Sequence, residues 1–554
     1  MRSLSRRLIA IVAPLVAQVV LTVPLLAAGP PASGPESSVL PQTQPGNPEA
    51  AKLTVETSRP NVSLFTPSET IQLTFTATGL AAGEKQQLKL RYADEFDKVR
   101  ATKDVDIEAD ANGRWSGTVE GLNDKLGFYK VFAALSNGTP LASAGSRPSG
   151  YLTYAVTPDP YARPNLPQSE CIFGMQGDYN AKTEIVMPFL GIHWYNKTYG
   201  WKYFESINSG KFEQNVEKAR TTQHDGYRMP LIPLNSKTTF EIAGKKLDWP
   251  ANGLLYVYDP PNWAIKPGSR SQVPTTGVLT PDGEKAWAVH CRKLASLFKE
   301  EGPADQRHFY EVTWEPNVPW GWKGTPAELV RVYQIAYQEL HAADPKAVVT
   351  GPTLALSPST YDEMLALFQE GLAKYLDVID IHPYSQETPE KQRLVERMRA
   401  LRTLAREQSG RDLPIIATES GLLSMPNTSE GWLRQARHNI REALILIGER
   451  FSMNQSFYLH DGYNLTGEKN AQHGYFVQLH DIEKEYLHGA DLIAPKPVAA
   501  AYAAMTFLLD GYKSVSDITW MGESALGYAY HRNGEVILAL WDWSGTPRKV
   551  NIPT

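Results

Sequence analysis

The stretch HFYEVTWEPNVPWGWKGTPAELVRVYQIAYQELHAADPKAVVTG, residues 308–351, predicts a strand, a helix and a second strand in succession. Its two ends, 308–314 and 347–351, are short apolar runs typical of buried strands. TPAE (325–328) fits a helix N-cap, a first-turn proline and a capping-box acid, and an apolar stripe of helical spacing follows. The stretch therefore predicts one unit of a parallel sheet covered by helices.

Similar units recur from about residue 158 to 505. The expected strands are 171–175, 189–193, 254–258, 308–314, 347–351, 377–382, 413–418 and 455–460. Eight such units predict a (β/α)8 TIM barrel, whose active site lies at the C-terminal ends of the strands. A doubly wound sheet is the alternative, but no Gly-rich phosphate loop follows the first strand. Within 211–250, MPLIPLNS (229–236) is either the third strand or a prelude to LLYVY (254–258).

The ends of the chain predict export and additional β-domains. In residues 1–28, Arg2, Arg6 and Arg7 precede a long apolar run, which is typical of a signal peptide and predicts a secreted or periplasmic protein. The run is also long enough for a retained membrane anchor, so both alternatives stay open. Residues 29–52 form a Pro-, Ser- and Gly-rich linker without apolar periodicity. Short alternating segments predict an N-terminal β-sandwich at 53–157 and a partial C-terminal β-domain at 506–554.

Composition narrows the class of ligand. The net charge is −5 with both signs interspersed, so neither nucleic acid nor an anionic membrane surface is an expected partner. The 13 Trp, 26 Tyr and 17 Phe residues favour flat, hydroxyl-rich ligands, although aromatic side chains also fill cores. Only Cys171 and Cys291 are present, and we expect buried thiols rather than a disulfide framework.

Two glutamates follow expected strands and are candidates for chemistry. Glu315 comes after the fourth strand and Glu419 after the seventh. Two carboxyls at one barrel mouth can cleave a glycosidic bond, because one protonates the leaving oxygen while the other attacks or activates water. A single glutamate in such a loop is more often a solvated charge, and the pairing is what favours catalysis.

The order of several motifs resembles a known family. Glu-Pro-Asn (315–317), His-Pro-Tyr (382–384), Thr-Glu-Ser-Gly (418–421) and the late segment GYF…PKPVAAAYAAM (474–505) follow one another as in clan A glycoside hydrolases. The chain is most similar to family 39 and related bacterial exopolysaccharide hydrolases, over about residues 170–510. The C-terminal β-domain also resembles the one that accompanies this barrel.

The resemblance implies roles for the residues in these motifs. Glu315 would be the general acid and then the base, and Glu419 the nucleophile, in a reaction that retains anomeric configuration with carboxyls about 5 to 5.5 Å apart. Glu419 then needs hydrogen bonds that keep it ionised. Tyr384 would position the nucleophile and His382 would line the same wall, although either residue could simply pack the barrel mouth.

Further residues are expected to bind the sugar. Trp263 matches the tryptophan that ends the third strand in the family, and Trp320 and Trp322 lie just after Glu315. His193 is expected to end strand two and His460 strand eight; any of these could instead brace loops. No cofactor is expected, and no metal site either, because a close histidine pair and an HExxH motif are both missing from the sequence.

Trp314 departs from the family pattern. Most of the clan has asparagine before the acid, where it donates a hydrogen bond to the sugar 2-hydroxyl. Three explanations remain: a substrate such as an amino sugar, replacement of the contact by Asn317 or His382, or loss of catalysis with retained sugar binding. Because both carboxyls are present, we expect an active enzyme.

The sequence thus predicts an exported retaining glycoside hydrolase that acts on a polysaccharide or oligosaccharide. An exo-acting glycosidase on small glycosides is a second enzymatic interpretation. From a different class, the alternative is a non-catalytic polysaccharide-binding or export-complex protein on a degenerate barrel.

Overall fold

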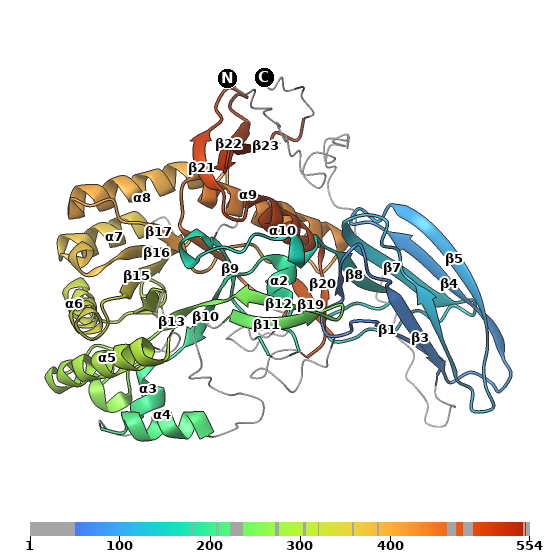
Figure 1. The fold of residues 1–554 in the computed structure, drawn as a ribbon, viewed down its shortest axis with the longest axis horizontal. Coiled ribbons are helices and arrows are strands. Elements are labelled where there is room, and N and C mark those ends of the chain that lie inside the picture. The colour runs from blue at the N-terminus through green and yellow to red at the C-terminus, as the bar shows by residue number, and fades with distance from the viewer. Residues whose placement is uncertain are drawn as a thin grey trace, which may run out of the picture.

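The computed structural model describes residues 50–546 and 549, except 178, 181, 207, 209, 222–236, 272–275, 303–305, 320, 357–358, 385–386, 463–471 and 480–490. Within this part of the chain, eight parallel strands close into a barrel, and a β-sandwich and a small antiparallel sheet lie beside it (Figure 1). The predicted (β/α)8 barrel is confirmed. The expected signal segment and nearly all of the expected linker lie outside the described residues.

The barrel strands are short and almost wholly buried. In chain order they are β9 (Phe173–Met175), β10 (Trp194–Thr198), β13 (Asn252–Tyr256), β14 (His308–Glu311), β15 (Ala347–Ala355), β16 (Val378–His382), β17 (Ile415–Ala417) and β18 (Met453–Ser456). β18 pairs with β9 and closes the ring. Because the strands are all parallel, their C-terminal ends share one mouth.

Helices surround the barrel. They are α2 (Val186–Leu190), α3 (Trp201–Glu205), α4 (Phe212–Thr221), α5 (Pro281–Glu301), α6 (Pro326–Ala343), α7 (Thr360–Gln369), α8 (Leu394–Ser409), α9 (Ser429–Gly448) and α10 (Pro497–Leu509). The predicted capping box at α6 is confirmed, with Thr325 accepting from the N–H of Glu328 and the Glu328 side chain accepting from the N–H of Thr325. The free cysteines Cys171 and Cys291 are buried, as expected.

The second barrel strand was predicted wrongly. The run 189–193 contains the end of α2, which Gly191 terminates in a left-handed conformation with φ of 70°. The strand is β10, which begins one residue after His193. A short apolar run does not distinguish a buried strand from a buried helix, and here the whole of α2 is buried.

The third strand is β13, which includes the first three residues of LLYVY. The segment before it forms a hairpin, with β11 (Lys237–Ile242) antiparallel to β12 (Lys245–Pro250). MPLIPLNS lies outside the described residues.

The N-terminal sandwich consists of two facing sheets. Its strands are β1 (Lys52–Thr57), β2 (Leu64–Phe65), β3 (Gln72–Thr78), β4 (Lys85–Ala93), β5 (Val99–Glu108), β6 (Trp115–Glu120), β7 (Gly127–Leu135) and β8 (Tyr151–Val156). One sheet has the order β1-β3-β6 and the other β2-β8-β7-β4-β5. Alternate residues of β3 and β4 are buried, which explains the period-two pattern of the sequence.

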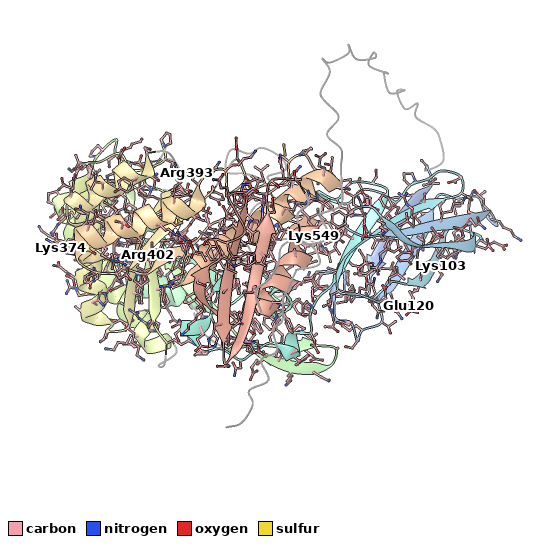
Figure 2. All side chains as sticks on the ribbon, turned by 90° about the horizontal axis from the view of Figure 1, so that it is seen from above. Lys103, Glu120, Lys374, Arg393, Arg402 and Lys549 are labelled. Atoms are coloured by element: carbon pink, nitrogen blue, oxygen red, sulfur yellow. The ribbon has the colours of Figure 1, made fainter. Side chains whose placement is uncertain are left out.

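The sandwich packs firmly against the barrel helices. The ring of Trp432 on α9 makes edge contacts with Phe128 and Tyr151 of the sandwich. Lys130 donates to the hydroxyl of Ser429 at the start of α9, over 2.7 Å. Figure 2 places Lys103 and Glu120 on the sandwich at one end of the molecule, with Lys374 and Arg402 at the barrel end.

The C-terminal sheet is antiparallel and covers the end of α9. It contains β21 (Lys513–Asp517), β22 (Ala525–Arg532) and β23 (Glu535–Asp542). A further small sheet pairs β19 (Phe476–Gln478) with β20 (Ile493–Pro495). Tyr528 and Tyr530 of β22 donate to Glu449 and to the carbonyl of Leu444, which fixes the sheet to the barrel.

Candidate active site

Two glutamates lie just past the C-terminal ends of barrel strands. Glu315 follows β14 and Glu419 follows β17, the fourth and seventh strands in chain order. One oxygen of each carboxyl and a ring nitrogen of His382 all lie within 4.8 Å of one another. The barrel therefore brings the two carboxyls together at its mouth.

The backbone at Glu315 is strained. Its φ is 42° and that of Thr353, on the neighbouring strand, is 55°. Such left-handed conformations cost a side-chain-bearing residue about 1 kcal/mol or more. The N–H of Glu315 donates to the carbonyl of Thr353 over 2.9 Å, which couples the two strained residues. Strain of this kind concentrates at functional sites.

Glu419 is buried and surrounded by hydrogen-bond donors. Its Oε1 accepts from the indole Nε1 of Trp314 at 2.8 Å and from Nε2 of Gln176 at 3.0 Å, and its Oε2 accepts from the hydroxyl of Tyr384 at 2.6 Å. Burial, together with the nearby Glu315 carboxyl, raises the pKa of Glu419 above its ordinary value, while His382, Tyr384 and Gln176 act to lower it. The donors stabilise the ionised form and fix the orientation of the carboxyl plane.

His382, the last residue of β16, joins the two carboxyls. Its Nδ1 lies 2.8 Å from Oε1 of Glu315 and 3.6 Å from Oε2 of Glu419. Burial alone would lower the pKa of His382, but the Glu419 and Glu315 carboxylates raise it to about 10. His382 thus faces both candidate catalytic groups, and its raised pKa favours the protonated ring.

Trp314 belongs to the same cluster. Its indole N–H is a donor to Glu419, and its ring lies 6.2 Å from that of His382. The residue that departs from the family pattern is thus a direct partner of the candidate nucleophile. Sequence reasoning missed this contact because it depends on the reach of a side chain across the barrel mouth.

A second pair of carboxyls lies beneath the first, and sequence reasoning missed it as well. Asp380 and Glu311 are buried residues of β16 and β14. Asp380 accepts from the hydroxyls of Thr418 at 2.9 Å and Thr353 at 3.0 Å. Burial raises the pKa of Asp380 to about 7 and that of Glu311 well above its ordinary value. The available signal was a charged residue inside each apolar strand, but the face that such a residue occupies depends on the register of the strand.

The side chains of Glu315, His382 and Glu419 are of the types that bind metal ions. Among the described residues, Glu315, His382 and Glu419 are the group whose ligating atoms approach closely enough to surround a cation. The Nδ1 atom of His382 faces both carboxylates, and the raised pKa keeps a proton on it. A metal ion bound here would have to displace this proton, because a metal requires a free lone pair on the nitrogen.

His193 is not placed at the barrel mouth, contrary to expectation. Since β10 begins after it, His193 lies at the N-terminal end of the barrel. It is fully buried, its Nε2 lies 3.1 Å from Asp510, and its ring stacks on Trp249. Arg163 lies 3.5 Å from the same carboxylate. His193 therefore braces the closed end of the barrel.

We expect His193→Gln to lower the free energy of unfolding by about 3 to 5 kcal/mol near neutral pH, because it breaks a buried ion pair. Burial would lower the pKa of His193, but Asp510 raises it from 6.5 to about 10. The stabilisation is thus full below the ordinary pKa and is lost as the pH rises through the folded-state value. Urea unfolding of both proteins should show a difference that is largest at about pH 6 and smaller at about pH 10. A constant difference across this range would contradict the assignment.

Trp263 and Asn317 also lie outside the carboxyl cluster. The indole of Trp263, in the loop after β13, donates to the carbonyl of Glu205 at 2.8 Å and its ring packs on Trp201. The amide of Asn317 donates to Ala355 and Glu363 and accepts from the N–H of Ala355. The structure shows these polar groups holding neighbouring loop segments, and the sugar-binding roles of both residues stay predictions.

Three further residues were expected to bind sugar, and the structure describes two of them. Trp320 lies outside the described residues. Trp322 donates to the carbonyl of Thr325 at the start of α6, which turns its indole N–H towards the protein. His460 is buried, with Nδ1 2.9 Å from Nε2 of Gln478 and 2.9 Å from the carbonyl of Asp461. This nitrogen of His460 therefore contacts its neighbour Asp461 and the end of β19.

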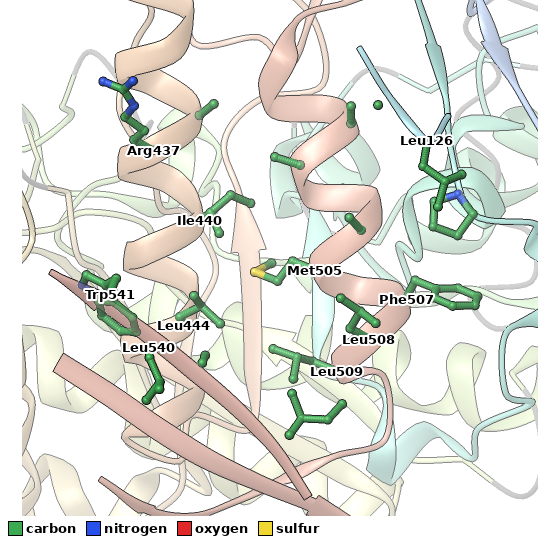
Figure 3. Close-up of a pocket in the computed structure, with 18 of the residues that line it drawn as sticks. Leu126, Arg437, Ile440, Leu444, Met505, Phe507, Leu508, Leu509, Leu540 and Trp541 are labelled. Atoms are coloured by element: carbon green, nitrogen blue, oxygen red, sulfur yellow. The ribbon is translucent and has the colours of Figure 1, made fainter. Parts of the chain in front are cut away.

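A cavity of about 300 Å³ lies between α9, α10 and β23, apart from the carboxyl cluster. Ile440 and Leu444 of α9 and Met505 of α10 extend into the space between the two helices (Figure 3). Arg437 is the one charged residue among those that line it, and its guanidinium points away from that space. The cavity contains no group for acid–base chemistry and is not the candidate site.

Comparisons with known proteins give only a likeness to solved structures. No protein-family model matches the chain, and no curated protein sequence matches it. Matching structures include beta-glucuronidase 2 of Bacteroides uniformis, with 12% identity, coverage of 91% of this chain and 58% of that chain, and a TM-score of 0.35. A GH39 beta-xylosidase from Caulobacter crescentus has 13% identity, coverage of 67% and 77%, and a TM-score of 0.41. A glucosidase from Croceicoccus marinus has 10% identity, coverage of 67% and 76%, and a TM-score of 0.39.

The present chain thus spans less than two thirds of the length of the beta-glucuronidase. The GH39 enzyme belongs to the family that the motif order resembles. At these identities and scores, however, the matches carry no conclusion about the activity of this chain.

Proposed function

We propose that the protein is a retaining glycoside hydrolase that acts on a polysaccharide or oligosaccharide. The observation that supports this function is the approach of Glu315 and Glu419, whose nearest ligating oxygens lie within 4.8 Å at the barrel mouth. Retaining glycosidases hold their carboxyls about 5 to 5.5 Å apart, whereas inverting enzymes leave about 6.5 to 9.5 Å for a water molecule. The close spacing therefore favours direct attack on the sugar.

In the first step, an oxygen of Glu419 forms a bond to the anomeric carbon while the bond to the leaving oxygen breaks. Glu315 gives its proton to that oxygen, so the departing group leaves as a neutral alcohol. Trp314, Gln176 and Tyr384 hold Glu419 in one orientation for the attack. Because the side chain is preorganised, little motion is required at the moment of reaction.

In the second step, water attacks the anomeric carbon and the ester bond to Glu419 breaks. Glu315, now a carboxylate, accepts the proton of the water and returns to its starting state. The negative charge resides on Glu419 before the reaction, on Glu315 in the intermediate, and on Glu419 again at the end. His382 lies within 3.6 Å of both carboxyls and can stabilise the charge in either place.

Export is part of the proposal. The basic residues Arg2, Arg6 and Arg7 ahead of an apolar run support a secreted or periplasmic location, either free or held by the uncleaved segment. In the described part of the chain, the helices are all too short or too polar to cross a bilayer. A polymeric glycan outside the cytoplasm is the substrate class that fits such a location.

The proposed activity can be tested with a panel of glycans that includes amino-sugar polymers. Purified protein and the double variant Glu315→Gln/Glu419→Gln are compared for release of reducing ends. We expect turnover by the wild type alone, and NMR of the first-formed product should show the anomeric configuration of the substrate. If neither protein turns over any glycan while both bind one equally, the protein is a binding module and not an enzyme.

Trp314→Phe tests the contact that departs from the family pattern. The substitution keeps a ring but removes the donor to Glu419, and a hydrogen bond to a charged group contributes about 1.5 to 3 kcal/mol. We expect kcat to fall about 10- to 100-fold, with a smaller change in KM. Trp322→Phe is the matched control, because the indole N–H of Trp322 donates to the Thr325 carbonyl instead. Equal effects of the two substitutions would contradict a specific role for Trp314.

A further inference from the structure

A continuous chain of hydrogen bonds runs from the barrel interior to Glu315. Asp380 accepts from the hydroxyl of Thr418 over 2.9 Å, and that oxygen lies 3.0 Å from Nε2 of His382. The opposite ring nitrogen, Nδ1, lies 2.8 Å from Oε1 of Glu315. Asp380, Thr418 and His382 are fully buried, so water does not compete for these contacts.

We infer that Asp380 and Thr418 are positioning residues for His382, and that they hold its ring as a cation that faces both catalytic carboxyls. This inference rests on the proposed function and extends it to two residues that do not touch the reacting atoms. It assigns a role to the acidic residue beneath the barrel mouth.

The hydrogens available on Thr418 and His382 determine which atom donates in each contact of the chain. The hydroxyl of Thr418 has one hydrogen, and an ionised Asp380 can only accept it. Thr418 must then accept from Nε2 of His382, which places a hydrogen on that nitrogen. Asp380 is held as an acceptor from a second side as well, because the hydroxyl of Thr353 also donates to it.

The other ring nitrogen requires a hydrogen for a functional reason. Glu315 has to present its proton to the leaving oxygen, so the oxygen that faces His382 must accept rather than donate. Nδ1 lies close to Glu315 and Glu419 and must therefore donate. With hydrogens on both nitrogens the ring is an imidazolium, which keeps the acidic proton of Glu315 on the oxygen that faces the substrate.

The charges around the ring are consistent with a cation. His382 is faced by Glu315, Glu419, Asp380, Glu311 and the phenol of Tyr384. Asp380 is faced by His382, Glu311 and the phenol of Tyr333. Burial raises the pKa of Glu311 well above its ordinary value and that of Asp380 only to about 7. Of the two interior acids, Asp380 is the one whose ionised form is stabilised by two hydroxyl donors, those of Thr418 and Thr353.

Imidazole ¹⁵N NMR tests the inference without any substrate. The His382 signals are assigned by their loss in His382→Gln. We expect both ring nitrogens to be protonated in the wild type at about pH 8, and the titration midpoint to fall by at least about 1 pH unit in Asp380→Asn and in Thr418→Val. Thr418→Ser keeps the hydroxyl and should retain the wild-type midpoint. A neutral His382 in the wild type, or an unchanged midpoint in both altered proteins, would overturn the inference.

A matched control and an activity profile separate positioning from general damage. Asp377→Asn alters a carboxylate just before the same strand, where it contacts His341 and the N–H of Val349, and should leave His382 unchanged. In kcat/KM against pH, the basic limb should move to lower pH in Asp380→Asn and Thr418→Val but not in Thr418→Ser. An equal loss at every pH would mean a merely structural role. If the wild type lacks turnover, the proposed function fails while the NMR result still decides the state of His382.

Discussion

Glu419→Gln is expected to reduce kcat by at least about 10⁴-fold, because it removes the group that bonds to the anomeric carbon. The carbonyl oxygen of glutamine can still accept from Trp314 and Gln176, and its amide N–H can donate to the hydroxyl of Tyr384, so the side chain keeps nearly the same shape. Binding of an oligosaccharide should therefore survive when turnover is lost. Calorimetric titration together with a turnover assay measures both.

Replacement of Glu419 by glycine tests specifically whether this residue is the nucleophile. In Glu419→Gly, added azide can take the place of the carboxylate and form a glycosyl azide of inverted configuration, while Glu315 still protonates the leaving oxygen. We expect azide to restore turnover in this variant but not to accelerate the wild type. Glu449→Gln provides the control for loss of a buried carboxylate, because Glu449 pairs with Arg399 beneath the C-terminal sheet. If Glu419→Gln retains the wild-type rate, Glu419 is not the nucleophile.

The sequence predicts the barrel well because each unit repeats the same signals. The capped helix at Thr325 and the apolar runs that became β14, β15 and β16 all combine local preferences that agree with the final fold. Strand two fails because α2 is buried on all sides, so its sequence lacks the polar face that marks a surface helix. That single error moved His193 from the closed end of the barrel to its mouth.

The candidate site is predictable where a residue lies at the end of a strand or within four residues of it. Glu315, His382 and Glu419 are located by their strands, and the structure brings them together. Trp263 and Asn317 lie further along the loops after β13 and β14, whose paths depend on tertiary packing, and their polar groups hold neighbouring segments. The spacing of residues in the sequence does not reveal the paths of these loops.

The two interior acids could not be predicted from the sequence for a different reason. Asp380 and Glu311 stand within strands, and side chains alternate between the barrel interior and the surrounding helices along each strand. Deciding which face a residue occupies requires the register of the strand to within one position. The contacts of Asp380 with Thr418 and Thr353 come from two neighbouring strands, so they follow from closure of the sheet and not from any local motif.

The second large effect is expected for Glu315→Gln, and it should depend on the leaving group. With a natural sugar as the leaving group, loss of the proton donor should lower kcat/KM by about 10² to 10⁴-fold. An aryl glycoside with an acidic phenol needs no protonation, so Glu419 should still attack it at a rate close to that of the wild type. Steady-state kinetics with two glycosides of the same sugar, one with each kind of leaving group, measure the difference.

Hydrolysis of the intermediate, the second step, distinguishes an acid–base role of Glu315 from a general defect of the active site. Without a base at position 315, water attacks the intermediate slowly, so the acidic aryl glycoside should give a rapid burst of phenol followed by slow turnover. The hydrogen bond from His382 is available to the glutamine carbonyl, and the variant should therefore keep its fold and its affinity for sugar. Similar losses on both glycosides without a burst would mean that Glu315 only positions the substrate, because an acid–base residue must affect the two leaving groups differently.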